Sequence, residues 1–152
     1  MTKYILGALT CLIVMTATPA MAQRSSSGIA LGAQFGSPSG IGLRLKSDGQ
    51  STYDFVAAWD LDDFFFVNGH ILFDKPIGTD RRTTFFYGPG LFLGFRDRQA
   101  GENEAVFGFS ASAGISFRSD PFEFMLRLTP RISVIPDTDA TIGGGVGFYY
   151  WF

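Results

Sequence analysis

The chain has 152 residues, a formal net charge of −2, one histidine and one cysteine. This length suits a single domain, and the slight excess of acidic side chains excludes a basic surface for nucleic acid. Aromatic residues make up 16% of the chain, yet no apolar run after residue 22 is long enough to cross a membrane as a helix. Apolar residues that recur in short alternating segments are instead typical of a transmembrane barrel, in which only every second residue meets lipid.

The first 22 residues have the form of a secretory signal peptide. A basic start at Lys3 is followed by an apolar core over residues 5–15 and by Ala20-Met21-Ala22, an A-x-A cleavage site in which Ala20 and Ala22 are the small residues. The apolar core is short for a membrane-spanning helix, so we expect cleavage after Ala22. The alternative is that the segment is retained as an anchor.

Residues 23–152 then form the mature domain, about 130 residues long, which suits one barrel. Cys11, the only cysteine, lies in the removable segment. We therefore expect no disulfide, no zinc–thiolate site and no cysteine nucleophile in the mature protein.

Eight segments of the mature domain alternate apolar residues with glycine, serine or charged residues, which is the period of a β-strand with two different faces. In chain order they cover about residues 28–36, 41–46, 52–59, 64–74, 84–96, 105–118, 122–129 and 142–152, and the seventh continues to 134 if Pro130 is tolerated. Turn-forming residues gather between them, at 37–40, 47–50, 60–63, 75–82, 97–104, 119–121 and 135–140. Within the fifth segment, Pro89 removes one ladder hydrogen bond and predicts a bulge.

The two faces of these strands differ in a way that predicts which one points outward. In residues 105–118, Phe107 and Phe109 share one face, whereas Gly108 and Ser110 share the other. A face of glycine, serine and few charges makes a poor soluble exterior but fits the crowded interior of a small barrel. We therefore predict an all-β fold, an eight-stranded antiparallel transmembrane barrel of the bacterial outer membrane. The alternative is a soluble barrel of lipocalin type, whose apolar face surrounds a ligand.

The last strand ends the chain on aromatic residues. Phe148, Tyr150 and Phe152 fall on the apolar face, and no charged residue follows them. This arrangement resembles the closing strand of bacterial outer-membrane barrels, whose C-terminal aromatic residue acts as the assembly signal. The resemblance implies that Phe148, Tyr150 and Phe152 form this signal and that the barrel-assembly machinery binds it during insertion.

Several short motifs extend the resemblance over the mature chain. They are Gly36-x-Pro38-x-Gly40-Ile41 at the first turn, Ala58-Trp59 at the end of the third strand, Tyr87-Gly88-Pro89-Gly90 in the fifth, Pro130 followed by residues 135–139, and the glycine-rich aromatic last strand. With them the chain resembles a family of small bacterial outer-membrane barrels of OmpA-like architecture that includes spirochaete surface proteins. The family implies a location and a fold but no agreed activity. The chain departs from it at Arg127, where members tend to carry an acidic residue.

Charged and polar side chains on the inward face are expected to pair, because an unpaired charge in the lumen would be costly. Simple hairpin registers place Lys46 opposite Asp54, Asp54 opposite His70, Arg118 opposite Glu123, and Arg127 opposite Gly114. The missing side chain of Gly114 would leave room for a guanidinium group. The predicted lumen network contains Arg44, Lys46, Asp54, Asn68, His70, Arg118, Glu123 and Arg127.

No catalytic, cofactor-binding or metal-binding site is predicted. Ser110 and Ser112 lie on a strand that is not adjacent to the strand of His70, so we expect no nucleophile–base pair, and His70 is interpreted as a packed structural residue. An acidic loop could hold a hard cation such as calcium, but a solvated loop is the better interpretation of Asp60, Asp62 and Asp63. Aromatic residues near strand ends are interpreted as an interfacial girdle, namely Tyr53, Trp59, Phe73, Tyr87, Tyr150 and Phe152.

The function expected from these features is structural or surface-interaction work in the bacterial outer membrane, without enzymatic activity. The outward connections are short, which argues against an adhesive or catalytic crown. The expected partners are outer-membrane lipid and, during insertion, the assembly machinery; a monomer is expected, and an extracellular protein partner stays open. The alternative is a small-ligand or lipid-handling barrel that uses the glycine-lined interior, which a lumen cavity with few crossing side chains would favour.

Overall fold

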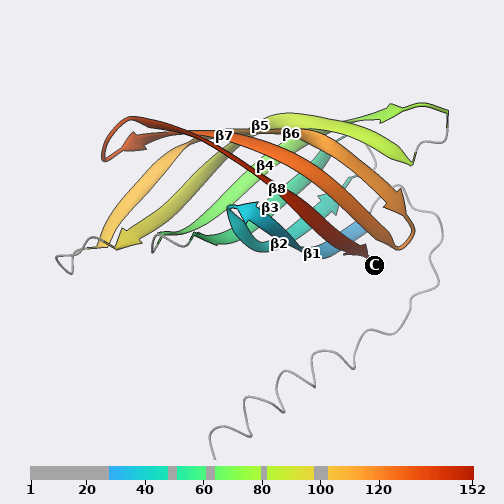
Figure 1. Cartoon of the computed structure of the whole chain (residues 1–152), viewed down its shortest axis with the longest axis horizontal. Helices are drawn as coiled ribbons and strands as arrows, with labels where there is room; N and C mark the ends of the chain where they lie inside the picture. Colours follow the sequence, from blue (N-terminus) through green and yellow to red (C-terminus); the bar gives the residue numbers. More distant parts are fainter. Residues whose placement is uncertain (1–27, 48–50, 61–63, 80–81, 98–102) are drawn as a thin grey trace, which may run out of the picture.

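The computed structural model describes residues 28–47, 51–60, 64–79, 82–97 and 103–152. These residues form eight antiparallel strands that close into a barrel in chain order, as Figure 1 shows. The strands are β1 (Gly28–Ser37), β2 (Ser39–Lys46), β3 (Ser51–Asp60), β4 (Phe64–Ile77), β5 (Thr83–Asp97), β6 (Asn103–Ser119), β7 (Phe122–Ile135) and β8 (Asp139–Trp151). The predicted all-β, eight-stranded antiparallel barrel is confirmed.

The predicted signal peptide, with Ala20 and Ala22, lies outside the described residues and stays a prediction. Within the residues that the structure describes, no helix is long and apolar enough to span a membrane.

The pairing of β8 with β1 closes the barrel. Residues 30–37 lie opposite residues 144–151, and the other ladders join strands that are neighbours in the sequence. Every strand therefore has a partner on each side, and the sheet has no open edge. Gly28 and Trp151, the first residue of β1 and the last of β8, lie at the same end of the barrel, which is termed the terminal end below.

The side chains alternate between the interior and the exterior, as the sequence predicts. Along β7, exposed and buried residues alternate strictly for eleven residues, with Phe124 and Leu126 exposed and Met125 and Arg127 buried. The outer surface of the other strands is likewise rich in exposed large apolar side chains. The barrel thus has an apolar exterior and an interior that holds its buried charges.

Each strand extends beyond its predicted range at one end or both, and the largest extensions are in three strands. β4 continues to Ile77, β8 begins at Asp139, and β7 runs through Pro130 to Ile135. The cause is pairing with the neighbouring strand, because Ile77 lies opposite Thr83 and Ser133 lies opposite Asp139. The ladder partner therefore overrides the local signal of polar residues and proline.

The bulge predicted at Pro89 is not observed. His70 pairs with Gly90 and Phe73 pairs with Tyr87, so the register between β4 and β5 is the same on both sides of Pro89. Pro89 has no N–H to donate, and the ladder is interrupted between these two pairs rather than shifted. The register shift lies instead between β6 and β7, at Phe107 and Gly108.

The predicted pairing of Lys46 with Asp54 is wrong by two residues. Asp54 lies opposite Arg44, and Lys46 lies opposite Thr52. The reason is a tighter connection than the sequence suggests, because the backbone N–H of Ser47 already bonds to the carbonyl of Ser51. The other predicted pairings hold: Asp54 with His70, Arg118 with Glu123, and Arg127 with Gly114.

Two apolar clusters fill the interior on either side of the charged residues. The cluster nearer the terminal end consists of Ala30, Leu72, Phe86, Met125, Tyr149 and Trp151. The cluster nearer the opposite end consists of Val56, Ala58, Phe66, Phe92 and Val106. The charged residues between the two clusters are buried, with Arg44, Asp54, Glu123 and Arg127 less than 5% exposed.

Candidate functional site in the barrel lumen

A row of polar residues crosses five neighbouring strands on the inner wall. Ladder pairs join Arg44 of β2 to Asp54 of β3, Asp54 to His70 of β4, His70 to Gly90 of β5, and Gly90 to Ser110 of β6. Inward-facing residues of neighbouring strands lie close in space, so these side chains are brought together by the register alone.

Two arginines and two acidic residues form a compact charge cluster that crosses the lumen. Nη1 of Arg44 donates to Oε1 of Glu123 on β7 at 2.6 Å, and Nε of Arg44 lies 3.4 Å from Oδ1 of Asp54. Nη2 of Arg127 lies 2.8 Å from Oδ2 of Asp54. The four charges are all buried and their formal charges cancel, so each buried ion has a partner of opposite sign.

Aromatic and amide side chains complete this cluster. Nε1 of Trp151 donates to Oε2 of Glu123 at 2.6 Å, so both oxygens of Glu123 are hydrogen-bonded. Gln34 accepts a 3.2 Å hydrogen bond from Nη1 of Arg127. The guanidinium of Arg44 lies 5.7 Å from the ring centre of Phe86 and 5.6 Å from that of Tyr149, which is a favourable distance for cation–π attraction.

His70 links Asp54 to the hydroxyl of Ser110. Nδ1 of His70 lies 3.7 Å from Oδ2 of Asp54, and Nε2 lies 3.1 Å from Oγ of Ser110. The sequence argument that these strands are too far apart for a contact is wrong, because the residue between them on β5 is Gly90, which has no side chain to keep them apart.

The succession of contacts from Asp54 to His70 to Ser110 is that of a catalytic triad, but its geometry favours a structural role. Ser110 is 7% exposed, and its hydroxyl donates to Oδ1 of Asn68 at 2.9 Å. A hydroxyl has a single proton, and here it is directed to Asn68 and not to Nε2 of His70. The nearer oxygen of Asp54 is held by Arg127, so the carboxylate is already paired.

Lys46 and Arg118 lie away from the buried cluster, at the terminal end. Nζ of Lys46 lies 3.3 Å from Oδ2 of Asp74, which also accepts a 2.7 Å bond from Thr52. Nε of Arg118 donates to the exposed Asp120 at 2.6 Å, and its guanidinium lies 4.5 Å from the ring centre of Trp151. Arg118 is opposite Glu123 in the ladder but bonds to Asp120, whereas the two oxygens of Glu123 accept from Arg44 and Trp151.

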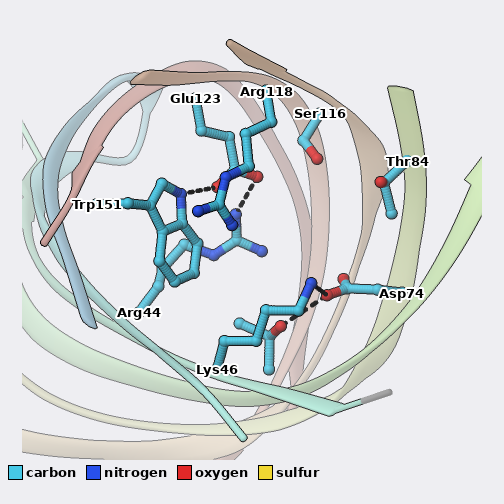
Figure 2. Close-up of a pocket in the computed structure, with 9 residues that line it drawn as sticks. Arg44, Lys46, Asp74, Thr84, Ser116, Arg118, Glu123 and Trp151 are labelled. Carbon is cyan, nitrogen blue, oxygen red and sulfur yellow. Dashed lines mark hydrogen bonds and ion pairs between the residues drawn. The ribbon is translucent and has the colours of Figure 1, made fainter. Parts of the chain in front are cut away.

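These side chains surround a cavity of about 150 Å³ at the terminal end, which is termed the vestibule. Its lining includes Lys46, Thr52, Asp74, Thr84, Ser116 and Arg118. Figure 2 shows the side chains of Lys46, Asp74 and Arg118 around it. Arg44, Glu123 and Trp151 of the charge cluster also line it, so the vestibule and the cluster share a boundary.

The sequence found most of the inward charges but missed several of their partners. Gln34, Asp74, Ser110, Tyr149 and Trp151 all contact the predicted residues. The available signal was the period of two, which places Tyr149 and Trp151 on the inward, glycine-bearing face of the last strand. The period alone does not show which charged residues these two aromatic side chains contact.

The remaining predicted residues lie on the exterior or outside the described residues. Phe148, Tyr150 and Phe152 are exposed, and Phe148 stacks on Phe122 with ring centres 5.4 Å apart. Tyr53, Phe73 and Tyr87 of the predicted girdle are also exposed. The side chains of Trp59 and Asp60 and all of residues 61–63 lie outside the described part of the chain. Among the residues that are described, no group of His, Cys, Asp or Glu is arranged to hold a metal ion.

These features define a class of protein, the closed eight-stranded antiparallel barrels with a side-chain-filled lumen. Among solved structures, the chain is similar to the N-terminal β-barrel domain of OprF from Pseudomonas aeruginosa. The TM-score is 0.57 at 12% sequence identity, and the match covers 83% of this chain and 98% of that domain. At this identity the likeness shows the fold alone.

Sequence comparison adds no closer relationship. No protein-family model matches the chain, and no curated protein matches it. Membership of the small-barrel family that the motifs resemble therefore stays a prediction.

Proposed function

We propose that this protein is an integral β-barrel of the bacterial outer membrane, with a structural or surface-interaction role in the envelope and without catalytic activity. The observation that carries the proposal is the difference between the two faces of the barrel wall, which is apolar outside and polar inside. Leu126 and Leu128 are about 60% exposed on the same strand on which Glu123 and Arg127 are buried. Soluble monomers rarely expose continuous apolar surface of this kind, whereas a bilayer would cover it.

The same arrangement, with the apolar face outside and the polar face inside, argues against a soluble barrel of lipocalin type. Such a barrel needs its apolar face inside, around the ligand, and a polar face in water. Here the interior is crossed by the ion pairs of Arg44 with Glu123 and of Arg127 with Asp54. Eight strands leave an interior just wide enough for side chains, so these crossing residues also argue against a passive diffusion pore.

The cross-lumen bonds support a structural role. They tie β7 to β1 through Gln34, to β2 through Arg44 and to β3 through Asp54, strands that are far from it in the sequence. Each bond opposes separation of the two sides of the barrel. A wall braced in this way suits a rigid anchor that presents its short connections at the cell surface.

The expected partners follow from the exterior. Outer-membrane lipid would cover the apolar wall, and the barrel-assembly machinery would bind the end of β8, where Phe148, Tyr150 and Phe152 are exposed. Closure of the sheet leaves no edge for pairing with a second copy, which supports a monomer.

Cell fractionation followed by electrophoresis tests this proposal. We expect the full-length protein in the outer-membrane fraction, with a band that migrates differently before and after boiling because the folded barrel resists the detergent. Deletion of Phe152 should reduce this heat-modifiable band, whereas Phe152→Tyr, which keeps a terminal aromatic residue, should retain it. A soluble periplasmic protein without a heat-dependent shift would rule out the membrane location.

A further inference from the structure

The vestibule contains more hydrogen-bond donors than acceptors. Its two carboxylates are already occupied, since Glu123 accepts from Arg44 and Trp151, and Asp74 accepts from Lys46 and Thr52. Carboxylates that are satisfied in this way repel an incoming anion less than free ones would.

The donors are less fully used. Within the described chain, the hydroxyl groups of Thr84 and Ser116 and the terminal nitrogens of Arg118 have no hydrogen-bond partner, although they line the cavity. Nζ of Lys46 makes one long contact, 3.3 Å to Asp74, and keeps donors to spare. Among the described residues, the acidic partner of Arg118 is Asp120, whose side chain is 78% exposed and therefore gives a weak ion pair.

These donors approach the cavity from different directions. Lys46 projects from β2, Thr84 from β5, and Ser116 and Arg118 from β6. In Figure 2, the side chain of Lys46 lies across the cavity from Arg118, and the hydroxyls of Ser116 and Thr84 lie to one side, between these two basic residues and above Asp74. Hydroxyl, ammonium and guanidinium donors around one small space are the groups that proteins use for a tetrahedral oxyanion.

We propose that the vestibule binds a phosphate group, held by Lys46 and Arg118 with hydrogen bonds from Thr84 and Ser116. A cavity of about 150 Å³ accommodates one such group and excludes a large ligand. The group comes either from free phosphate or from the headgroup of a phospholipid at the terminal end. Binding is weak, because the carboxyl groups of Asp74 and Glu123 also line the cavity.

Trp151 reports on occupancy, because the guanidinium of Arg118 lies over its ring. The chain has two tryptophans, so Trp59→Phe leaves Trp151 as the sole fluorophore. This variant, folded in an uncharged sugar detergent, is titrated with inorganic phosphate at constant ionic strength, with chloride as the reference salt. The expected result is a saturable change in Trp151 emission with phosphate and none with chloride.

Substitutions distinguish a specific phosphate site from nonspecific attraction of anions. Thr84→Val with Ser116→Ala keeps the Arg118–Trp151 contact and should weaken binding several-fold. Arg118→Gln should weaken phosphate binding at least tenfold. Because this substitution also changes the surroundings of Trp151, binding to this variant is measured by broadening of the phosphorus NMR signal of phosphate. The matched control is Arg82→Gln, which removes an exposed arginine at the same end of the barrel and should leave binding unchanged.

A second titration distinguishes the two sources. Saturation by inorganic phosphate supports a site for free phosphate, whereas saturation only by a short-chain phosphatidylglycerol below its micelle concentration supports a headgroup site. The proposal is overturned if neither compound gives saturable binding to the vestibule, or if Arg82→Gln weakens binding as much as Arg118→Gln. The heat-dependent gel shift checks that each variant is folded, so a loss of binding is not confused with a loss of the barrel.

Discussion

Asp54 is the residue on which the buried charges converge. Its two oxygens face Nε of Arg44 at 3.4 Å, Nη2 of Arg127 at 2.8 Å and Nδ1 of His70 at 3.7 Å. A single carboxylate therefore balances part of the charge of two buried guanidinium groups. Its removal would leave that charge without compensation in a region shielded from water.

Asp54→Asn tests this convergence, because asparagine keeps the size of the side chain and removes only its charge. We expect the free energy of unfolding to fall by about 3–5 kcal/mol, the usual cost of breaking a buried ion pair from one side. Urea unfolding of the detergent-folded barrel, followed by the gel shift, measures the change. Asp120→Asn, which removes an exposed acidic partner of Arg118, is the control and should leave the midpoint almost unchanged. Equal midpoints for the two variants would show that the Asp54 charge does not hold the barrel together.

At the level of strands, Gly90 of β5 allows a side chain of β4 to contact a side chain of β6. His70 and Ser110 lie on either side of it in the same ladder row, and their side chains meet over its backbone. A Cβ at position 90 would collide with the ring of His70 and with the carbonyl of Gly69. The glycine is thus a requirement of the contact between two strands that are not neighbours.

Gly90→Ala should therefore destabilise the barrel, by about 1–3 kcal/mol as for other overpacked interiors. The matched control is Gly69→Ala on β4, where the added methyl group would face outward and meet Phe55 at an ordinary contact distance of 3.4 Å. Chemical unfolding of both variants in the same detergent decides the point. If Gly69→Ala is the more damaging of the two, the contact of His70 with Ser110 is not the reason for the glycine.

The strands were predictable because each carries its own period of two, and a slip by one residue would turn every charge toward the outside. Hairpin registers were harder, since the length of a turn depends on backbone bonds such as that from Ser47 to Ser51. This is why Lys46 was assigned to Asp54 in place of Arg44.

Contacts across the lumen could not be predicted from hairpins at all. The bond of Arg44 with Glu123 depends on the stagger accumulated around the whole barrel and on the closure of β8 onto β1. The contact of His70 with Ser110 likewise depends on two ladders, those that join β5 to β4 and to β6. These pairs become visible only when the registers of several ladders are combined.

At the level of the whole molecule, the barrel is a closed sheet with its charges inside and its apolar side chains outside. The likeness to the OprF domain at 12% identity indicates that this architecture tolerates almost complete replacement of the sequence. What the fold requires is the alternation of the two faces and enough small inward residues for the large ones to fit. The proposed outer-membrane location requires that the outward face of the strands lies in lipid.

Spin labels along β7 test this claim most directly. The only native cysteine is Cys11, so in a Cys11→Ser background single cysteines are introduced from Phe122 to Ile135 of the barrel reconstituted in bilayers. We predict a period of two: outward positions such as Leu126 and Leu128 are relaxed by oxygen, which concentrates in lipid, and inward positions such as Met125 are not. Access of a water-soluble nickel chelate to the outward positions, or a profile without this period, would contradict the account.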